Sequence, residues 1–283
     1  MFVVRGSEKN SALASNNEQQ IPTMHPILFE AGPVTIYTYG FLIAVGAALA
    51  FTYMARQGKR QFGITFDQSN TLFIILIVAG VVGGKLFMIF EDPAYYARNP
   101  GKLISGSGFV FYGSLLLCIP TMLWFFKRNK LPVLGMLDIM AIVTCIVHAF
   151  GRLGCFMAGC CYGLPTDNWL GVIFTDPTCQ AKPLDTPLHP TQLYESAFIF
   201  LLMTGLFILR PRKTFDGQVF LVYLIIYACG RSIIEMFRGD IERGFLIKDI
   251  ISNSQFISIL IVSVAAFFYV KLSRNANLIV NKK

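Results

Sequence analysis

Residues 70–90 read NTLFIILIVAGVVGGKLFMIF, and this stretch decides the class of fold. It is as long as the ~20 residues that a helix needs to cross ~30 Å of hydrocarbon, and its one charged residue is Lys85. Six further apolar blocks of similar length lie at 34–55, 108–126, 137–157, 193–209, 218–237 and 255–271. The sequence therefore predicts an all-α integral membrane protein with seven transmembrane helices.

The composition of the 283 residues agrees with this class. Hydrophobic residues make up 54% of the chain and charged residues 14%, whereas a soluble domain carries about 25% charged residues. The first 30 residues are polar and contain no apolar core of a signal peptide, so we expect a mobile tail at 1–30. A single membrane domain is expected at 31–273, followed by a basic cytoplasmic tail at 274–283.

The Lys and Arg residues predict the orientation in the membrane. Four short stretches hold 13 of the 24 basic residues. These are Arg56, Lys59 and Arg60; Lys127, Arg128 and Lys130; Arg210, Arg212 and Lys213; and Lys271, Arg274, Lys282 and Lys283. Short basic connections stay in the cytoplasm, which puts the N-terminus outside and the C-terminus inside. The net charge of +8 is thus a topology signal, and no nucleic-acid partner is expected.

The longest connection, at 159–190, joins the fourth and fifth expected spans. It contains five prolines together with Tyr162 and Trp169. Long loops in compact proteins are functional or disordered. The prolines and aromatic residues of this connection favour a partly ordered outer segment. We therefore expect the active site to face the outer leaflet.

Charged residues inside apolar spans cost several kcal/mol and usually face a cavity or a partner. Arg231, Glu235 and Arg238 are spaced i, i+4, i+7 and would share one helix face. They form either an internal salt-bridge stripe or a guanidinium cluster for an anionic head group. Lys85 either reaches the interface through its long stem or joins the site. His148, one turn before Arg152, is either a packing residue or a catalytic group.

The seven cysteines allow several interpretations. Three lie within spans and are explained as small apolar residues, namely Cys118, Cys145 and Cys229. Cys155, Cys160, Cys161 and Cys179 lie at or beyond the outer end of the fourth span. They are either free thiols or include a disulfide from Cys179 to Cys160 or Cys161. The Cys155-x4-Cys160-Cys161 spacing differs from the C-x2-C pair of zinc sites, so neither a metal nor a cofactor is predicted.

A series of short motifs occurs in order along residues 37–244. They read Tyr39-Gly40, Gly84-Lys85-Leu86, Gly108-Phe109-Val110-Phe111-Tyr112-Gly113, Gly151-Arg152-Leu153-Gly154-Cys155-Phe156 continuing to Gly163, His189-Pro190-Thr191-Gln192-Leu193-Tyr194-Glu195, and Tyr227 followed by Gly230-Arg231-Ser232-Ile233-Ile234-Glu235-Met236-Phe237-Arg238. In this order, on a chain with seven expected spans, the series resembles the bacterial prolipoprotein diacylglyceryl transferase family.

The resemblance implies a transferase of the bacterial cytoplasmic membrane. Its substrates would be phosphatidylglycerol and the lipobox cysteine in the signal peptide of a prolipoprotein. The diacylglyceryl group would pass to the thiol, forming a thioether and releasing glycerol phosphate. The phosphate must be held while its negative charge grows, and the nucleophile must be a thiolate.

The resemblance also assigns roles by position. Arg152 and Arg231 would hold the phosphate. Tyr39 and Tyr227 would orient the head group, and His189 would order the outer segment. The polar network would be completed by Arg238, Glu235 and Glu195. The substrate site would also be lined by Lys85, Gly113, Gly154 and Gly163.

Three positions depart from the family's pattern. Tyr112 stands where the family has a third-span histidine, and Cys155 and Cys160 replace an asparagine and a glutamate of the arginine motif. A phenol, with a pKa of about 10, is a poorer base than imidazole. Either that histidine is dispensable, or Tyr112 beside Arg152 or Arg231 replaces it, or His148 does. A member with a changed acceptor or without activity also fits.

Other classes of protein would use the same residues differently. A transporter or flippase for an anionic lipid or solute would bind it with the intramembrane arginines without covalent chemistry, and a receptor is suggested only by the number of spans. Internal repeats and broken helices are typical of transporters, and none is evident in the sequence. Thioether formation from phosphatidylglycerol and a lipobox peptide distinguishes these classes.

The orientation predicts which connections a probe reaches. A cysteine introduced at Asn168 or Lys182 should react with a membrane-impermeant maleimide added to intact cells, relative to the unsubstituted chain. Cysteines introduced at 127–130 should react only after permeabilisation. Labelling of 127–130 from outside would overturn the orientation.

Overall fold

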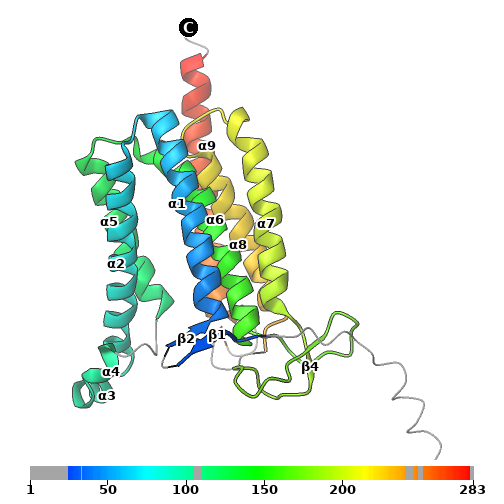
Figure 1. The fold of residues 1–283 in the computed structure, drawn as a ribbon. Coiled ribbons are helices and arrows are strands. Elements are labelled where there is room, and N and C mark those ends of the chain that lie inside the picture. Colours follow the sequence, from blue (N-terminus) through cyan, green and yellow to red (C-terminus); the bar gives the residue numbers. More distant parts are fainter. Residues whose placement is uncertain (1–24, 33, 105–109, 240–244, 248–250, 281–283) are drawn as a thin grey trace, which may run out of the picture. The chain divides into compact units, whose positions relative to one another are not determined.

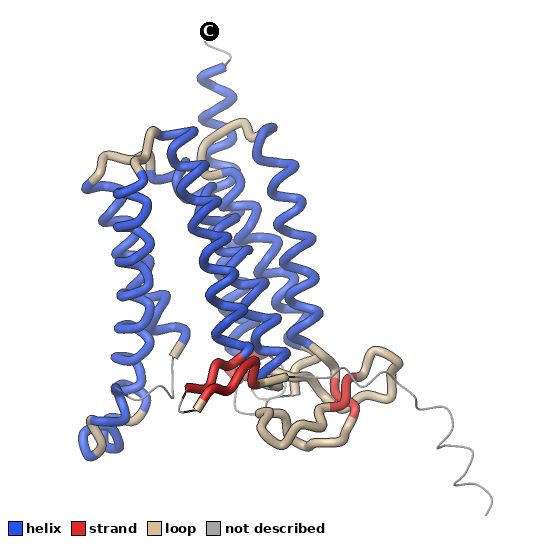
Figure 2. The backbone as a smooth tube through the Cα atoms, viewed as in Figure 1, coloured by secondary structure: helices blue, strands red, loops and turns tan. Residues whose placement is uncertain are grey.

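The computed structural model describes residues 25–32, 34–104, 110–239, 245–247 and 251–280, and its elements are mostly helices (Figures 1 and 2). The helices are α1 (Thr38–Phe62), α2 (Phe66–Glu91), α3 (Pro93–Arg98), α4 (Gly101–Ile104), α5 (Phe111–Arg128), α6 (Val133–Ala158), α7 (Thr191–Leu209), the 3-10 turn η1 (Arg210–Arg212), α8 (Gln218–Glu235) and α9 (Asn253–Val280). The strands pair as β1 (Ile27–Ala31) with β2 (Val34–Tyr37), β3 (Val172–Ile173) with β4 (Pro187–Leu188), and β5 (Phe245–Ile247) with β6 (Ile251–Ser252).

Some expectations lie outside the described residues. These are the tail up to residue 24, Gly108 and Phe109 at the start of the expected third span and of its motif, residues 240–244 at the end of the range that holds the motifs, and the basic tail beyond residue 280.

Six described helices are long and apolar enough to cross a membrane: α1, α2, α6, α7 with η1, α8 and α9. The protein is therefore an α-helical, multi-pass membrane protein. The expected third span corresponds to α5, which is not among the six. Helix α5 has 18 residues, and its charged last turn, with Lys127 and Arg128, lowers the mean hydropathy of the one window of that length.

The first span differs from the sequence-based prediction at its start. Val34–Tyr37 form strand β2, antiparallel to β1, and the helix begins at Thr38 instead of Val34. The residues Val-Thr-Ile-Tyr are β-branched or aromatic and favour a strand. Gly32 at the turn has φ 58°, a conformation that glycine adopts without steric cost. The apolar run thus contains two elements.

The sixth expected span ends earlier than predicted. Helix α8 stops at Glu235, and Arg238 forms an antiparallel β-bridge with Gly163. Arg238 is therefore not on the helix face that carries Arg231 and Glu235. A Cβ at Gly239 would lie 2.8 Å from the carbonyl oxygen of Gly163, so the two backbones approach closely at this point.

The chain divides into two compact units, each described by itself. The first comprises Met1–Gly46, Val147–Leu202 and Ile225–Val264, and the second comprises Ala47–Ile146, Met203–Leu224 and Ala265–Lys283. Helices α1, α6, α7, α8 and α9 each contribute residues to both units.

In the second unit, α2 and α5 lie side by side (Figure 1) and touch through small residues. A Cβ at Gly83 would lie 2.4 Å from the carbonyl oxygen of Gly113, so only glycine allows this approach. The Ser114 hydroxyl donates to the carbonyl of Gly80 at 2.8 Å. In lipid, where apolar burial does not drive helix association, such small-residue contacts supply the packing.

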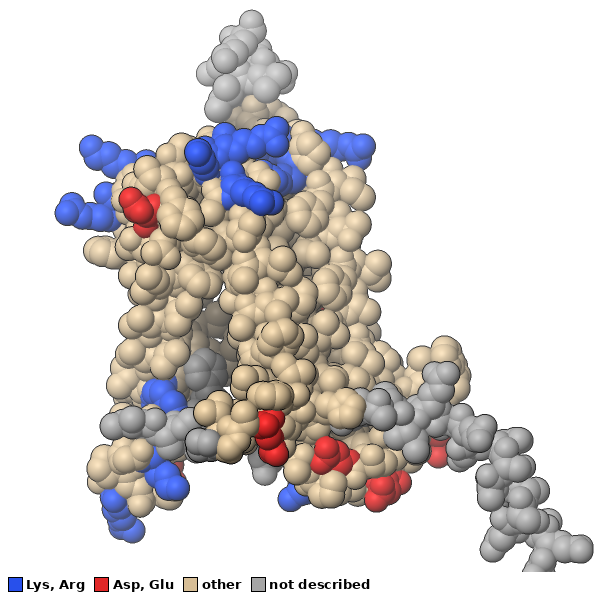
Figure 3. Space-filling model, in the orientation of Figure 1, with Lys and Arg blue, Asp and Glu red and all other residues tan. Residues whose placement is uncertain are grey.

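The rest of the second unit has an apolar core and a basic end. The core includes Leu72, Phe126 and Met136, all at most 2% exposed. Lys and Arg side chains gather where α1 and α5 end (Figure 3), and the last turns of these helices and of η1 supply them. Basic residues at helix C-termini also interact favourably with the helix dipole.

Asp138 of α6 anchors the start of α8. Its carboxylate is 2% exposed and accepts hydrogen bonds from the backbone N–H groups of Gly217 and Phe220, each at 3.0 Å. Lys213 Nζ donates to it at 2.9 Å. The carboxylate thus caps the N-terminus of α8, where a negative charge is favourable.

Removing this cap should destabilise the fold. We expect Asp138→Ala to lower the unfolding free energy by on the order of 3 kcal/mol, because it leaves two backbone donors without their acceptor. Among the described residues, Lys213 would keep only its ion pair with the exposed Asp216. Asp138→Asn is the matched control, since its amide oxygen can still accept, and it should lose less. Melting temperatures in detergent measure both, and an unchanged value for Asp138→Ala would refute the cap.

Candidate active site

In the first unit, a buried carboxylate joins polar groups from three helices. Glu195, in the first turns of α7, has a side chain that is 2% exposed. Its Oε2 lies 3.0 Å from Nε of Arg152, and its Oε1 lies 3.3 Å from Nε2 of His148. Tyr227 of α8 donates its hydroxyl to Oε1 at 3.0 Å. A carboxylate this buried requires such partners, so the arrangement is mutually stabilising.

Arg152 is held through one end of its guanidinium. In the described part of the chain, its hydrogen bonds and ion pair run from Nε to Glu195 and, at 3.4 Å, to Nε2 of His148. The predicted common face of His148 and Arg152 is thereby confirmed. Because Nε carries the polar contacts found within the described residues, the two Nη groups of Arg152 can take another acceptor. Such a fork binds two oxygens of a phosphate or carboxylate.

His148 is oriented by the same network. Its ring meets that of Tyr227 edge-on, with 5.3 Å between centroids. Its Nε2 faces both the Glu195 carboxylate and Nε of Arg152, so whichever tautomer is present, this nitrogen is engaged with its neighbours. The geometry suits a residue that positions Arg152 better than one that removes a proton from a substrate.

Arg231 and Glu235 share one face of α8, as their i, i+4 spacing predicts, and form an ion pair with Nη1 2.6 Å from Oε2. Nη1 of Arg231 is nevertheless buried without a hydrogen bond among the described residues. The guanidinium and the carboxylate are therefore in contact as an ion pair, although the N–H bonds of Nη1 do not point at Oε2. Arg231 also adds positive charge near Glu195. Nη1 is thus already paired with an anion, and it is the remaining N–H groups of the Arg231 guanidinium that can donate to a further acceptor.

The connection between α6 and α7 has its own apolar core. Phe174 and Leu188 are fully buried, and Cys179 and Ala181 pack with them. The backbone N–H of Gly163 donates to the carbonyl of His189 at 2.8 Å. Thr191 and Gln192 reach back from α7. They belong to the motif His189–Glu195, but the sequence assigned them no role of their own.

Those two side chains fix the backbone at the end of α6. Thr191 Oγ1 donates to the carbonyl of Cys161 at 2.7 Å, and Gln192 Nε2 donates to that of Cys160 at 2.5 Å. Cys161 has φ 62°, a conformation uncommon for non-glycine residues. Its strain persists because the surrounding contacts determine the backbone.

All seven cysteines are free thiols, so Cys179 forms no disulfide. The sulfur atoms of Cys155, Cys160 and Cys161 lie within 4.8 Å of one another. The pKa of the Cys161 thiol is lowered because Cys155 and Cys160 hydrogen-bond to it and the charges of Arg152 and Arg238 favour its thiolate.

The glycines of the predicted site lie at close backbone contacts. A Cβ at Gly154 would meet Cδ2 of Tyr39 at 3.0 Å, so Tyr39 packs on the arginine motif. A Cβ at Gly163 would lie 2.6 Å from Cβ of His189. His189 in turn bonds the hydroxyl of Tyr194 at 3.1 Å and stacks edge-on against Phe237.

Three predicted site residues belong to the second unit. Gly113 lies in the α2–α5 contact, Lys85 is half-buried near the end of α2, and Tyr112 is 55% exposed in the first turn of α5. The grouping found in the first unit thus contains Arg152, Arg231, His148, Glu195, Tyr227 and Glu235, with Tyr39, Gly154, Gly163, His189 and Arg238 around it.

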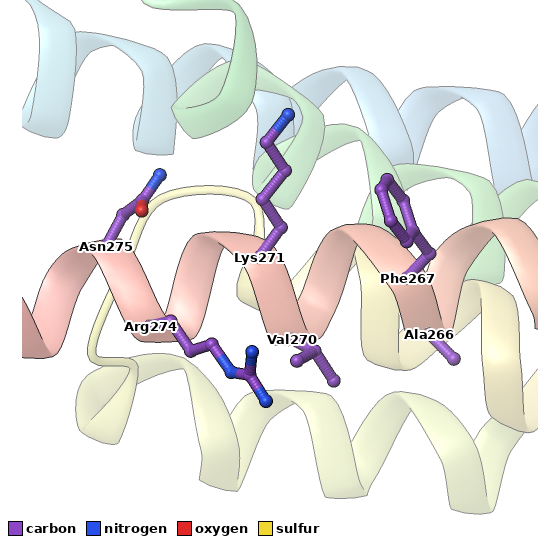
Figure 4. Close-up of a pocket in the computed structure, with 6 residues that line it drawn as sticks. All are labelled: Ala266, Phe267, Val270, Lys271, Arg274 and Asn275. Atoms are coloured by element: carbon purple, nitrogen blue, oxygen red, sulfur yellow. The ribbon is translucent and has the colours of Figure 1, made fainter.

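A groove elsewhere in the second unit does not have the character of an active site. Its lining residues are Ala266, Phe267, Val270, Lys271, Arg274 and Asn275 (Figure 4). All belong to α9. Phe267, Lys271 and Asn275 point to one side of the helix and the other three to the opposite side. The groove holds two cations and no acid, nucleophile or histidine.

Comparison with known proteins places the chain in a family. The family model for prolipoprotein diacylglyceryl transferase matches residues 26–271. A phosphatidylglycerol–prolipoprotein diacylglyceryl transferase of Clostridium tetani is 38% identical over 247 residues, which are 87% of this chain and 97% of the relative. A second, from Clostridium perfringens, is 34% identical and covers 84% and 92%, and a third, from Dehalococcoides mccartyi, is 31% identical and covers 87% and 92%. The chain therefore belongs to the prolipoprotein diacylglyceryl transferase family.

Proposed function

We propose that the protein transfers the diacylglyceryl group of phosphatidylglycerol to the lipobox cysteine thiol of a prolipoprotein signal peptide. The relatives are named as transferases with these two substrates. The observation that carries the proposal is the orientation of Arg152: a buried carboxylate holds its Nε and leaves the guanidinium fork for a phosphate.

The proposed reaction requires fixed positive charges beside the leaving phosphate. The acceptor thiolate attacks the glyceryl carbon next to the phosphate, the C–S bond forms, the C–O bond breaks, and glycerol phosphate leaves with the electron pair. Negative charge grows on the leaving phosphate, and preorganised cations stabilise it most in a site of low dielectric. Arg152 and Arg231 are 15% and 14% exposed, so their charges act with little screening by water.

The remaining site residues support these two arginines. Glu195, His148 and Tyr227 position Arg152, and Glu235 balances Arg231. Tyr39 packs on Gly154 beside Arg152 and would contact the head group, while His189, Gly163 and Arg238 order the chain next to it. Lys85, Tyr112 and Gly113 remain proposed contributors by their place in the motif series, and Tyr112 remains a candidate for handling the thiol proton.

We also propose seven spans, with the N-terminus outside and the site toward the outer leaflet of the bacterial cytoplasmic membrane. Counting α5 with the six long helices gives seven. The basic ends of α1, α5 and η1 support the orientation under the positive-inside rule. The connection at 159–190 would then be an outer segment close to an emerging signal peptide.

A carrier for an anionic lipid would also use buried arginines. The covalent function is favoured because the chain covers 92–97% of relatives named as transferases. Formation of a thioether-linked diacylglyceryl peptide by purified protein, phosphatidylglycerol and a lipobox peptide tests the proposal. Transport of the lipid without this product would replace it by the carrier.

Replacing either arginine by lysine should remove most of the turnover while keeping the fold. Lysine keeps the charge but loses the planar fork, and losing one preorganised donor costs about 100- to 1,000-fold in rate. We expect losses of this size for Arg152→Lys and Arg231→Lys, measured as thioether formed per minute. Arg128→Lys, at an exposed position on α5, is the control. Near-normal turnover in the two site variants would refute the phosphate clamp.

Glu195→Gln tests whether the carboxylate positions Arg152. The substitution keeps the volume but removes the negative charge that holds Nε, so Arg152 should become misaligned. We expect turnover to fall about 10- to 100-fold, with the KM for phosphatidylglycerol raised as well. Because the buried arginine also loses its counter-charge, the melting temperature should drop. Unchanged kinetics in a destabilised protein would show that Glu195 serves only the fold.

A further inference from the structure

Cys155, Cys160 and Cys161 form a compact group of soft ligands beside the proposed phosphate site. Their sulfurs lie within 4.8 Å of one another, and all three residues are half-buried. Zn–S bonds are ~2.3 Å long, so three thiolates around one zinc ion stand about 3.8–4.0 Å apart. The sulfurs need to move by less than about 1 Å to reach that geometry. The sequence spacing did not indicate this, because the turn after α6 brings the ligands together.

The backbone that carries these ligands is fixed before any ion binds. Thr191 and Gln192, at most 2% exposed, hold the carbonyls of Cys161 and Cys160. The N–H of Cys160 donates to the carbonyl of Cys155 at 3.1 Å, which closes the turn. Two of the three sulfurs thus sit on a clamped, locally strained turn, and the third sits on the last helical turns of α6. A preorganised set of this kind favours a coordinated ion over three mobile thiols.

The surroundings suit a thiolate–metal cluster. Three thiolates and one Zn²⁺ carry a net charge of −1, which needs positive neighbours in a half-buried site. Arg152 lies three residues before Cys155, on the same face of α6, and both Arg152 and Arg238 act electrostatically on Cys161. Soft thiolate ligands select Zn²⁺ and similar ions over Mg²⁺ or Ca²⁺.

We propose that Cys155, Cys160 and Cys161 bind one Zn²⁺ ion, and that the open fourth position takes the acceptor thiol of the lipobox cysteine. The second half rests on the proposed function. Zinc with three protein ligands keeps a position for water or substrate, and a thiol that coordinates it is deprotonated. This supplies the thiolate that His148, engaged with Glu195 and Arg152, is poorly placed to generate.

The step balances without an oxidant or reductant. The acceptor thiol binds zinc and loses its proton to solvent. The zinc-bound sulfur then attacks the glyceryl carbon, forming the C–S bond, while the C–O bond breaks and its electron pair leaves on glycerol phosphate. The thioether product is a weaker ligand than the thiolate and leaves the metal.

Metal binding is tested first, without turnover. Reduced, chelator-treated protein in detergent is titrated with Cd²⁺, whose bonds to thiolates absorb in the ultraviolet, and with Zn²⁺ in competition. We expect about one ion per chain and loss of the absorption in Cys155→Ser, Cys160→Ser and Cys161→Ser. Cys179→Ser, from the same region but outside the group, should bind as the wild type does. Equal binding by all four variants would overturn the site.

A second measurement uses wild-type protein, so it does not depend on whether the variants fold. In wild-type protein, Zn²⁺ should protect the three cysteines, but not the exposed Cys229, from alkylation mapped by mass spectrometry. Equal alkylation with and without Zn²⁺, or a disulfide within the group in freshly isolated protein, would overturn the proposal.

The fourth position is tested with a lipobox peptide and its Cys→Ser analogue. Added to Cd²⁺-loaded protein, the cysteine peptide should raise the thiolate–Cd absorption by about one third, as four sulfur ligands replace three, and the serine peptide should not. An unchanged absorption would overturn the acceptor role. Absorption growth without thioether product would leave the zinc site standing and refute the transferase function. Full turnover in metal-free protein would leave the transferase function standing and refute the role of zinc in activating the acceptor thiol.

Discussion

The contact between the buried carboxylate of Glu195 and Nε of Arg152 is the interaction on which the rest of the site depends. A charged guanidinium is expensive in an apolar span unless a counter-charge and hydrogen bonds accompany it. Glu195 supplies both, and it does so from the side that leaves the fork of Arg152 available. Tyr227 and His148 use the remaining acceptor capacity of the carboxylate. Three helices are thereby held together by the same contacts that orient Arg152.

The two arginines are balanced in different ways. Arg152 is paired across helices, and its position depends on how α6 and α7 pack. Arg231 is paired within α8, one turn from Glu235, so its position follows from the helix alone. Among the described residues, Nη1 of Arg231 has no hydrogen bond and the polar contacts of Arg152 run through Nε. Under the proposed function, the remaining N–H groups of both arginines would bind the phosphate.

Much of this arrangement could be predicted from residue types and spacing. Apolar blocks of span length located the helices, and i, i+4 spacing correctly joined His148 to Arg152 and Arg231 to Glu235. Boundaries were less accessible, because hydropathy does not distinguish the strand at Val34–Tyr37 from the helix that follows. Contacts between distant segments were least accessible. The three-sulfur group arises from a turn with φ 62° at Cys161, and that turn is held by side chains some 30 residues further along the chain.

The connection between α6 and α7 is tied at its two ends, since Gly163 bonds His189 and Pro165 pairs with Leu188. The residues between these two backbone contacts form a loop whose ends are adjacent in space. Closing a longer loop costs little more conformational entropy than closing a shorter one. Its length and composition can therefore change during evolution without moving Glu195 or Arg152. Under the proposed function, sequence variation in this loop would alter contacts with the signal peptide and leave the transfer chemistry unchanged.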